Sequence, residues 1–276
     1  MADIVYTGVN VSLCTEVRVC HQPGVRVCLP IGILVSMSDE QRIDAVAAGK
    51  GGVGKTTLAY EVAFQTDAVL VDLDWDKGGA TRAWGYRTEN RVRSPLLEAL
   101  ESGGKKIPRY MQGKGSRPDL LPGHEDFGLM QPTAEKMADL LETWAQAWGR
   151  DVVVDTHPGG VSSTMGAMAA ARSILVPNLF EEKPMEGLEG LLEQLGRTYP
   201  LLIVPNRVKG VIPDSYMQWL TRLSSDYQAP VVQYLEEFSW IPRRKLRRAI
   251  SSEPVPKRAE DFVLQVAAVV KEMKKR

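Results

Sequence analysis

The sequence predicts an α/β fold in which a mostly parallel, doubly wound sheet carries helices on both faces. From residue 43 onward, short runs rich in β-branched residues alternate with amphipathic stretches of helical period, and this alternation is typical of parallel sheets. The runs are apolar almost throughout, as strands buried on both faces are. A glycine-rich turn follows the first run, and two later runs end in aspartate. We expect a single domain over residues 37–276, without internal repeats.

Each expected element is a periodic stretch closed by a turn-forming residue. Met137, Leu140 and Trp144 mark the apolar face of a helix that Gly149 ends. Residues 102–118, rich in glycine, lysine and proline, are expected to form a mobile surface loop. The expected strands are 43–48, 68–72, 120–122, 151–155, 174–177, 201–205 and 230–234.

The glycine-rich turn fits the phosphate-binding pattern G-x-x-x-x-G-K-[ST] through Gly49, Gly54, Lys55 and Thr56. It leads into a helix-compatible stretch, 57–65, so the fold should be a P-loop NTPase sheet. Glycines let backbone N–H groups converge on phosphate oxygens at a helix N-terminus. Lys55 would reach the β- and γ-phosphates, and the Thr56 hydroxyl would bind Mg²⁺. The expected nucleotide-binding residues are Gly49, Lys50, Gly51, Gly52, Val53, Gly54, Lys55, Thr56 and Thr57.

A second lysine, Lys50, completes the run Lys-Gly-Gly-Val-Gly-Lys-Thr-Thr. This run resembles the deviant Walker A motif of the ParA/MinD family of ATPases, and the resemblance extends over residues 37–276. It implies ATP and Mg²⁺ as cofactors and an ATP-dependent homodimer in which Lys50 reaches the partner subunit's phosphates. Cations supplied in trans stabilise the charge of phosphoryl transfer, so Lys50 and Lys55 are implied to be catalytic. The alternative is that Lys50 is a solvated loop residue.

Residues 71–76, Val-Asp-Leu-Asp-Trp-Asp, resemble the family's switch I segment, which usually reads Asp-x-Asp-Pro-Gln. Asp72 and Asp74 are two apart at a strand end, so both should point to the same side. The resemblance implies that Asp74 is catalytic, positioning or activating the attacking water, and that Asp72 supports the Mg²⁺ site. A pair of helix-capping aspartates is the alternative. Trp75 and Asp76 depart from Pro-Gln and leave the loop geometry open.

Residues 151–155, Asp-Val-Val-Val-Asp, have the form of a Walker B strand. Asp155 would hold Mg²⁺ through water, because Mg²⁺ gives up its hydration reluctantly. The family usually continues with prolines, whereas here His157 takes the place of one of them, and we expect it to cap the loop rather than bind phosphate. Asn206 follows a later strand, where family members use asparagine to read adenine.

Five cations fall between residues 243 and 248, in a segment that resembles the family's Ile-Pro-Arg sequence before the C-terminal helix. If the segment is helical, Leu246 and Ile250 share a buried face while the arginines project outward. ParA proteins use basic residues in this region for non-specific DNA binding, which weakens steeply with salt. A solvated helix face is the alternative. The expected DNA-binding residues are Arg243, Arg244, Lys245, Arg247 and Arg248.

Three other functions fit the same architecture. A MinD-like membrane-positioning ATPase needs a free amphipathic helix, but the stripe within 262–270 is better explained as packing against the domain. A metal-transfer ATPase commonly places cysteines at its dimer interface, and no cysteine follows Cys28. An ATP-locked interaction protein would not need both Lys50 and Asp74. We therefore expect a ParA-type partition ATPase with a ParB-like activator protein. The alternatives are a MinD-like membrane-positioning ATPase or a cargo-positioning ATPase of the same family.

Composition adds two limits. The chain has 34 basic and 34 acidic residues among 276, so DNA binding requires a local patch. No apolar run is long enough for a membrane span, and we expect a cytoplasmic protein, nucleoid-associated if it binds DNA. Residues 1–36 contain all three cysteines in no zinc or disulfide pattern. We expect an irregular, dispensable N-terminal extension, translated upstream of the true start; a small regulatory arm is the alternative.

Overall fold

The computed structural model describes residues 41–76, 79–88, 94–244 and 248–276. The chain divides into two units, Met1–Glu40 and Gln41–Arg276, and the description below concerns the second. The predictions for residues 1–36, including their cysteines, lie outside the described residues.

The described residues form a six-stranded sheet in the order β3-β2-β4-β1-β5-β6. Every pair of neighbouring strands is parallel, which confirms the predicted fold class. Asp72, at the end of β2, lies opposite Asp155, at the end of β4, so both aspartates reach the same edge of the sheet. The strands are β1 Ile43–Val46, β2 Val69–Asp72, β3 Asp119–Leu121, β4 Val152–Asp155, β5 Ser173–Asn178 and β6 Leu201–Pro205.

The seventh predicted strand, 230–234, is wrong. This segment runs beside β6 but makes only an isolated bridge between Val231 and Ile203. Two backbone hydrogen bonds hold it there, one to the Pro230 carbonyl and one from the Val232 N–H, each 2.9 Å long. Pro230 itself has no N–H to donate, which limits it to such an edge position.

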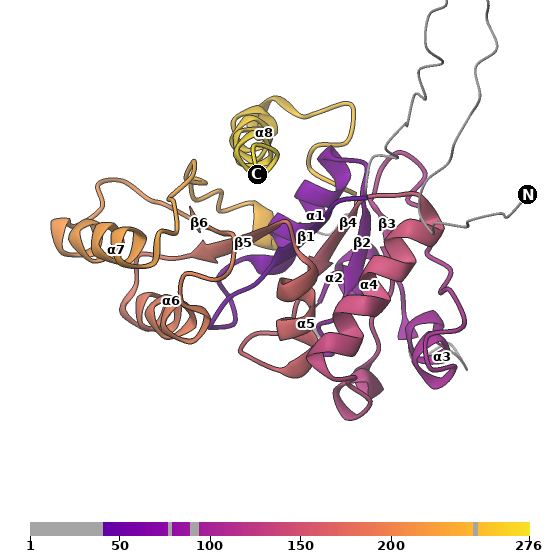
Figure 1. The fold of residues 1–276 in the computed structure, drawn as a ribbon. Coiled ribbons are helices and arrows are strands. Elements are labelled where there is room, and N and C mark those ends of the chain that lie inside the picture. The colour runs from indigo at the N-terminus through magenta and orange to yellow at the C-terminus, as the bar shows by residue number, and fades with distance from the viewer. Residues whose placement is uncertain (1–40, 77–78, 89–93, 245–247) are drawn as a thin grey trace, which may run out of the picture. The chain divides into compact units, whose positions relative to one another are not determined.

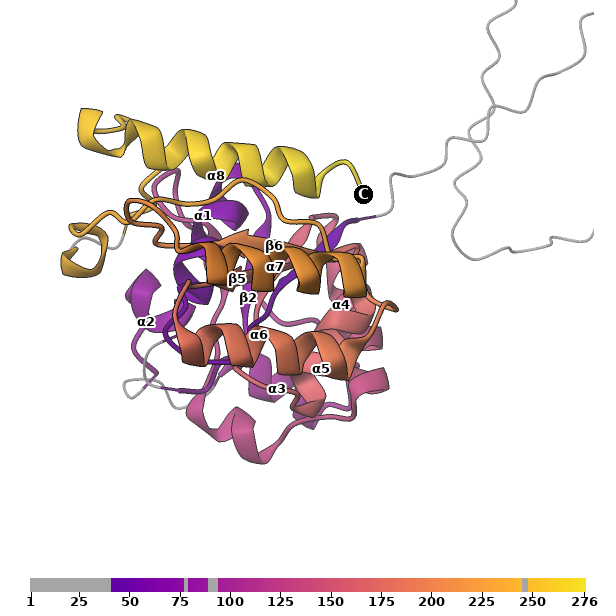
Figure 2. The same cartoon turned by 90° about the vertical axis from the view of Figure 1, so that its left-hand side faces the viewer.

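Helices cover both faces of the sheet (Figure 1). The view in Figure 2 shows α8 lying across one side of the strands, with α6 on the opposite side. The helices are α1 Lys55–Gln65, α2 Ala80–Trp84, α3 Pro95–Glu101, α4 Ala134–Trp148, α5 Ser162–Ala170, α6 Glu182–Leu195, α7 Asp214–Tyr227 and α8 Glu260–Met273, with short 3-10 turns at η2 Glu125–Leu129, η3 Ile241–Arg243 and η4 Lys257–Ala259.

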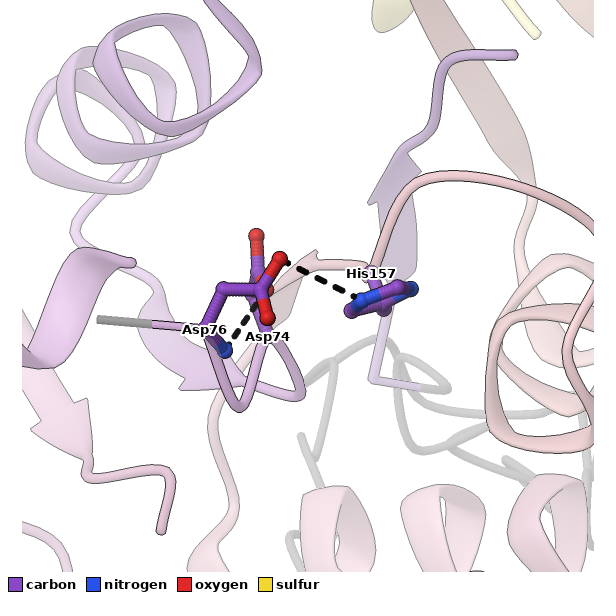
Figure 3. A group of neighbouring side chains, drawn as sticks. All are labelled: Asp74, Asp76 and His157. Atoms are coloured by element: carbon purple, nitrogen blue, oxygen red, sulfur yellow. Dashed lines mark hydrogen bonds and ion pairs between the residues drawn. The ribbon is translucent and has the colours of Figure 1, made fainter. Parts of the chain in front are cut away.

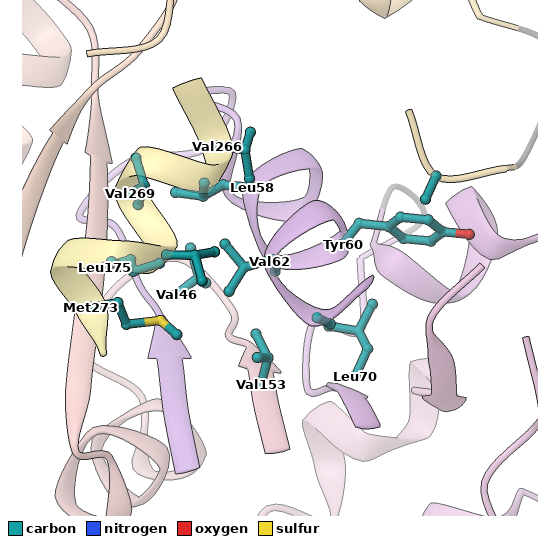
Figure 4. Packing of buried hydrophobic residues seen from close by; sticks show 14 of the residues in the cluster. Val46, Leu58, Tyr60, Val62, Leu70, Val153, Leu175, Val266, Val269 and Met273 are labelled. Carbon is teal, nitrogen blue, oxygen red and sulfur yellow. The ribbon is translucent and has the colours of Figure 1, made fainter. Parts of the chain in front are cut away.

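The first face of the sheet packs against α1 and α8, which lie beside each other. Figure 4 shows Val266 and Val269 of α8 near Leu58 of α1, and Val62 of α1 next to Val46 of β1. The apolar stripe of 262–270 is therefore buried in the core, as expected of a helix that packs against the domain. Within the described part of the chain, none of the helices combines the length and apolar character needed to cross a bilayer.

The opposite face carries α3 to α7. Strand residues alternate between the two cores, as the two-residue period of a strand requires: Val46 contacts the α1 side, whereas Ala45 contacts the α6 side. The predicted helix ending at Gly149 is α4, and its Thr133 side chain accepts a hydrogen bond from the Lys136 N–H. Gly149 closes α4 with a φ of 61°, a conformation that favours glycine.

The predicted surface loop, 102–118, is tied to β3 along its second half. Met111 and Leu120 exchange two backbone hydrogen bonds of 2.6 and 2.8 Å. The Gly113 N–H also donates to the Asp119 carboxylate over 2.8 Å. These bonds fold the loop back beside the sheet edge, and the Ser116 carbonyl of the loop accepts a 2.8 Å hydrogen bond from the Ala249 N–H, which follows the arginine segment.

Candidate nucleotide-binding site

The glycine-rich loop connects the carboxyl end of β1 to the first residue of α1. Gly54 adopts a φ of 95° at the N-cap of α1, in the left-handed region that favours glycine. A Cβ at this position would lie 2.2 Å from the Asn206 Nδ2. Val53 is buried and anchors the loop, whereas the two glycines before it are exposed. This open backbone turn at a helix N-terminus fits the phosphates of a nucleotide.

Helix α6 packs directly against the start of the loop. A Cβ on Gly49 would lie 2.0 Å from the Gly187 carbonyl oxygen, and one on Gly187 would lie 2.5 Å from the Lys50 Cγ. The aliphatic part of the Lys50 side chain therefore lies against α6 at Gly187. Lys50 is exposed, so its ammonium group is accessible to another molecule. Sequence reasoning missed the role of Gly187. The available signal was a glycine inside an apolar-periodic helix, where it costs about 1 kcal/mol relative to alanine without a packing reason.

Lys55, the first residue of α1, points into a buried group of carboxylates. Its Nζ lies 3.5 Å from the Asp74 Oδ2 and 3.8 Å from the Asp155 Oδ1. The lysine side chain is only 6% exposed, and that of Asp155 is fully buried. The structure thus brings together three of the predicted site residues, one from the loop and two from the ends of neighbouring strands.

Asp155 is a buried carboxylate that a bound cation would stabilise. Neither of its carboxylate oxygens has a hydrogen-bond partner, and its ion pair with Lys55 is 3.8 Å long; a buried carboxylate without hydrogen bonds is costly. Burial raises the pKa of Asp155 to about 6, although the Lys55 ammonium and the nearby Thr56 hydroxyl both lower it. A carboxylate and a hydroxyl are the oxygen ligands that Mg²⁺ prefers. Thr56 and Asp155 therefore fit the predicted metal site.

Asp72 uses its carboxylate differently. Its Oδ2 accepts a hydrogen bond from the Thr81 N–H over 2.6 Å, and its Oδ1 accepts one from the Asp74 N–H over 3.1 Å. Burial raises the pKa of Asp72 to about 7, and repulsion from Asp155 adds to this, whereas the hydrogen bonds lower it. Its oxygens thus fix the loop that follows β2. The predicted support of Asp72 for the metal site stays a prediction, and its observed contacts act through Asp74.

Trp75, Asp76 and His157, the residues that differ from the family pattern, lie close together after the ends of β2 and β4. The Trp75 ring stacks on the His157 ring, with centroids 3.8 Å apart and planes inclined by 5°. Figure 3 shows the His157 ring beside Asp74 and Asp76. The His157 Nε2 lies 3.5 Å from the Asp76 Oδ2, and its Nδ1 lies 2.8 Å from the Pro158 carbonyl. Ligand atoms of Asp74, Asp76 and His157 lie within 4.8 Å of one another, close enough to hold a divalent cation.

Asn206 follows β6 and holds the phosphate-binding loop. Its Nδ2 donates to the Val53 carbonyl over 2.7 Å, and its Oδ1 accepts from the Arg207 N–H over 2.9 Å. The Arg207 side chain contributes a longer bond of 3.4 Å to the Gly52 carbonyl. The role in reading adenine stays a prediction, because the observed contacts of Asn206 are with the loop. Arg207 was missed by sequence reasoning, since only the fold brings it to the loop.

The basic segment differs from the predicted helix. The described residues form only the 3-10 turn η3, after which Arg244 is extended with φ −66° and ψ 130°. The prediction that Arg244 projects outward is wrong: its Nη1 lies 3.9 Å from the Glu61 Oε1, and its side chain is 23% exposed. Arg243 and Arg248 are exposed, and Ile250 is buried as predicted. The remaining predicted residues, Lys245, Leu246 and Arg247, lie outside the described residues.

Comparisons with known proteins agree with this site. Residues 41–200 match the AAA domain family AAA_31. The chain is 31% identical over 209 residues to the chromosome-partitioning ATPase Soj of Thermus thermophilus, covering 72% of this chain and 80% of Soj. It is 28% identical over 208 residues to the chromosome partitioning protein ParA of Myxococcus xanthus, covering 71% of this chain and 69% of ParA.

The fold is similar to that of McdA from Cyanothece, solved as a complex of a variant with ATP, with a TM-score of 0.67 and 18% identity over 86% of this chain and 97% of McdA. The family match, the Soj relative and the geometry of the phosphate-binding loop lead to one assignment. This chain belongs to the ParA/MinD family of deviant Walker A P-loop ATPases.

Proposed function

We propose that this chain is a ParA-type ATPase that dimerises on Mg-ATP, binds DNA without sequence preference and hydrolyses ATP to drive plasmid or chromosome partition. The observation that carries the proposal is the different burial of the two lysines of the phosphate-binding loop. Lys55 is buried between Asp74 and Asp155, whereas Lys50 is exposed at the start of the loop. One cation thus serves its own subunit, and the other is accessible to the phosphates of a partner.

The proposed hydrolysis uses groups that are already close together. Lys55 would bind the β- and γ-phosphates, and moving toward them would weaken its contact with Asp74, now 3.5 Å long. Asp74 would then orient the water that attacks the γ-phosphorus and accept its proton as the bond to the β-phosphate oxygen breaks. Lys50 of the second subunit would stabilise the charge that develops on the transferred group. The products are ADP and inorganic phosphate.

Mg²⁺ would be held by Thr56 and Asp155, and when bound it would neutralise charge on the phosphates. Support comes from the buried Asp155 oxygens that lack hydrogen-bond partners. Asp72 would contribute by fixing the Asp74 backbone through its 3.1 Å hydrogen bond.

Dimers carrying ATP would bind DNA through the exposed arginines Arg243 and Arg248, with Arg244 held beside them. Hydrolysis, stimulated by a ParB-like activator protein, would release the DNA. Such a protein would work in the cytoplasm, on the nucleoid. The apolar stripe of α8 is buried, which favours DNA over a membrane surface as the partner.

Two substitutions test this function in a DNA co-sedimentation assay with Mg-ATP. Lys55→Ala should lose nucleotide binding and DNA retention together. Asp74→Ala should bind ATP, lose hydrolysis and remain on DNA as a trapped dimer. A parallel arm with anionic liposomes tests the MinD-like alternative: pelleting with liposomes but not with DNA would overturn the proposal.

A further inference from the structure

The arginine segment lines a cavity of about 480 Å³. Arg244 is anchored at its inner side by Glu61, whereas Arg243, Arg248 and Arg258 are exposed around it. The Arg258 guanidinium lies over the Trp240 ring at 5.0 Å from the centroid. The cavity is therefore strongly basic and has one aromatic wall.

A second basic cavity, of about 490 Å³, lies in the loop before β3. Lys114 and Arg117 supply its cations, and Trp84 and Tyr110 supply aromatic surface. The Arg117 guanidinium lies 4.7 Å from the Trp84 ring centroid and donates a 3.1 Å hydrogen bond to the Trp84 carbonyl. Lys114 is exposed on a backbone with φ of 53°. The sequence had indicated only a surface loop here.

The two cavities adjoin. Ser116 lines the second cavity and Ala249 the first, and the Ala249 N–H donates to the Ser116 carbonyl over 2.8 Å. Burial raises the pKa of Tyr60 on α1, whereas Arg117 from one cavity and Arg244 from the other both lower it. The lysine-bearing loop and the arginine segment are thus neighbours on one face of the domain.

The charge of the two cavity linings is one-sided. Among the described residues that line the two cavities, none is an aspartate or a glutamate. The whole chain has equal numbers of basic and acidic residues, 34 of each, so this excess is a local feature. Two adjoining basic cavities match a ligand whose anionic groups repeat, whereas a single small anion would occupy only one of them.

We propose that Lys114 and Arg117 extend the DNA-binding surface, contacting phosphates of the same nucleic acid that Arg243 and Arg248 contact. This rests on the proposed function and adds a second segment, 110–117, to its DNA interface. The contacts are with the sugar-phosphate backbone, which gives affinity without reading sequence.

Lys114→Asn tests the inference with little risk to folding, because asparagine tolerates a positive φ and the side chain is exposed. Loss of one phosphate contact should reduce the slope of log affinity against log salt by about 0.9. If the two proteins bind equally at 1 M salt, this difference in slope makes the variant bind plasmid DNA about eightfold more weakly at 0.1 M salt. The matched control is Lys274→Asn, which removes the same charge from an exposed site. Lys274 follows the C-terminal end of α8, whereas Arg258 of the first cavity precedes its N-terminal end. Mg-ATP binding should be unchanged in both variants.

The outcomes separate the two proposals. Arg243→Gln should weaken retention on DNA relative to the wild type, because it removes a cation of the proposed DNA interface. If it does so but Lys114→Asn keeps the wild-type slope, the extended surface is overturned and the function stands. If the wild type is not retained on DNA at all, both are overturned. An equal loss in Lys274→Asn would mean that net charge alone governs binding, and this too would overturn the site at Lys114.

Discussion

Glu61 joins the nucleotide-binding helix to the arginine segment, and replacing it should destabilise the protein strongly. It lies on α1 and is 1% exposed. Its carboxylate accepts hydrogen bonds from the Ile250 N–H at 2.7 Å, the Ser251 N–H at 3.0 Å and the Ser251 hydroxyl at 2.9 Å. The Arg244 Nη1 lies 3.9 Å away. Glu61→Ala would remove all of these acceptors at once.

The cost can be worked out from these contacts. A buried N–H left without a partner costs about 1–3 kcal/mol, and the Ile250 N–H is buried. Breaking a buried ion pair by removing one partner costs about 3–5 kcal/mol. Burial raises the pKa of Glu61 although its hydrogen bonds lower it, so the carboxylate itself is partly destabilised in the folded state. We therefore expect Glu61→Ala to lower the free energy of unfolding by about 3 kcal/mol.

Glu61→Gln keeps the volume and one acceptor oxygen, and should lose about 1–2 kcal/mol. Urea denaturation measures both variants; the midpoints should fall while the slope against urea is unchanged. Glu142→Ala, an exposed glutamate inside α4, is the matched control and should change stability by no more than about 0.5 kcal/mol. A loss below about 1 kcal/mol in Glu61→Ala would refute the reasoning, because water or another group would then replace the carboxylate.

Three further predictions concern the site. Gly54→Ala should abolish ATP binding in calorimetry, because alanine is strained at the Gly54 φ of 95° and its Cβ would lie 2.2 Å from the Asn206 Nδ2; wild-type affinity would contradict this. Gly187→Ala should displace Lys50, whose Cγ would lie 2.5 Å from the new Cβ, lowering ATP turnover more than ATP affinity; equal losses would argue against the trans role. Burial raises the folded pKa of Asp155 to about 6, above its ordinary 3.8. The folded state therefore holds the proton more tightly, and the wild type loses stability as the pH rises from about 3.8 to about 6. Asp155→Asn should therefore melt higher at pH 8 without metal, yet lose magnesium-dependent ATP binding, and a lower melting temperature would count against it.

The parts of the site that are local in sequence could be predicted from it. The phosphate-binding loop is a contiguous motif, and Asp74 and Asp155 meet Lys55 because parallel strands bring their carboxyl ends to one edge. Other features depend on contacts that no local pattern encodes. Glu61 and Ser251 are 190 positions apart, and the Gly187 approach to the loop requires the packing of a complete helix.

The two wrong predictions also have physical causes. For residues 230–234 the apolar run was read as a strand, but Pro230 lacks the donor that a full ladder needs. For the basic segment, outward arginines were expected from helical spacing. The segment instead turns Arg244 inward because a buried glutamate on α1 requires a cation and backbone N–H groups.

Helix α1 spans 11 residues and begins at the lysine that would hold the phosphates. Glu61 stands six positions later, about 9 Å along the axis. It accepts hydrogen bonds from the Ile250 and Ser251 N–H groups, which follow the arginine segment. Because Glu61 on α1 holds the backbone of Ile250 and Ser251, a tilt of α1 at its phosphate end would also move the chain next to the arginines. We therefore expect the bound nucleotide and the position of the arginine segment to be coupled through α1.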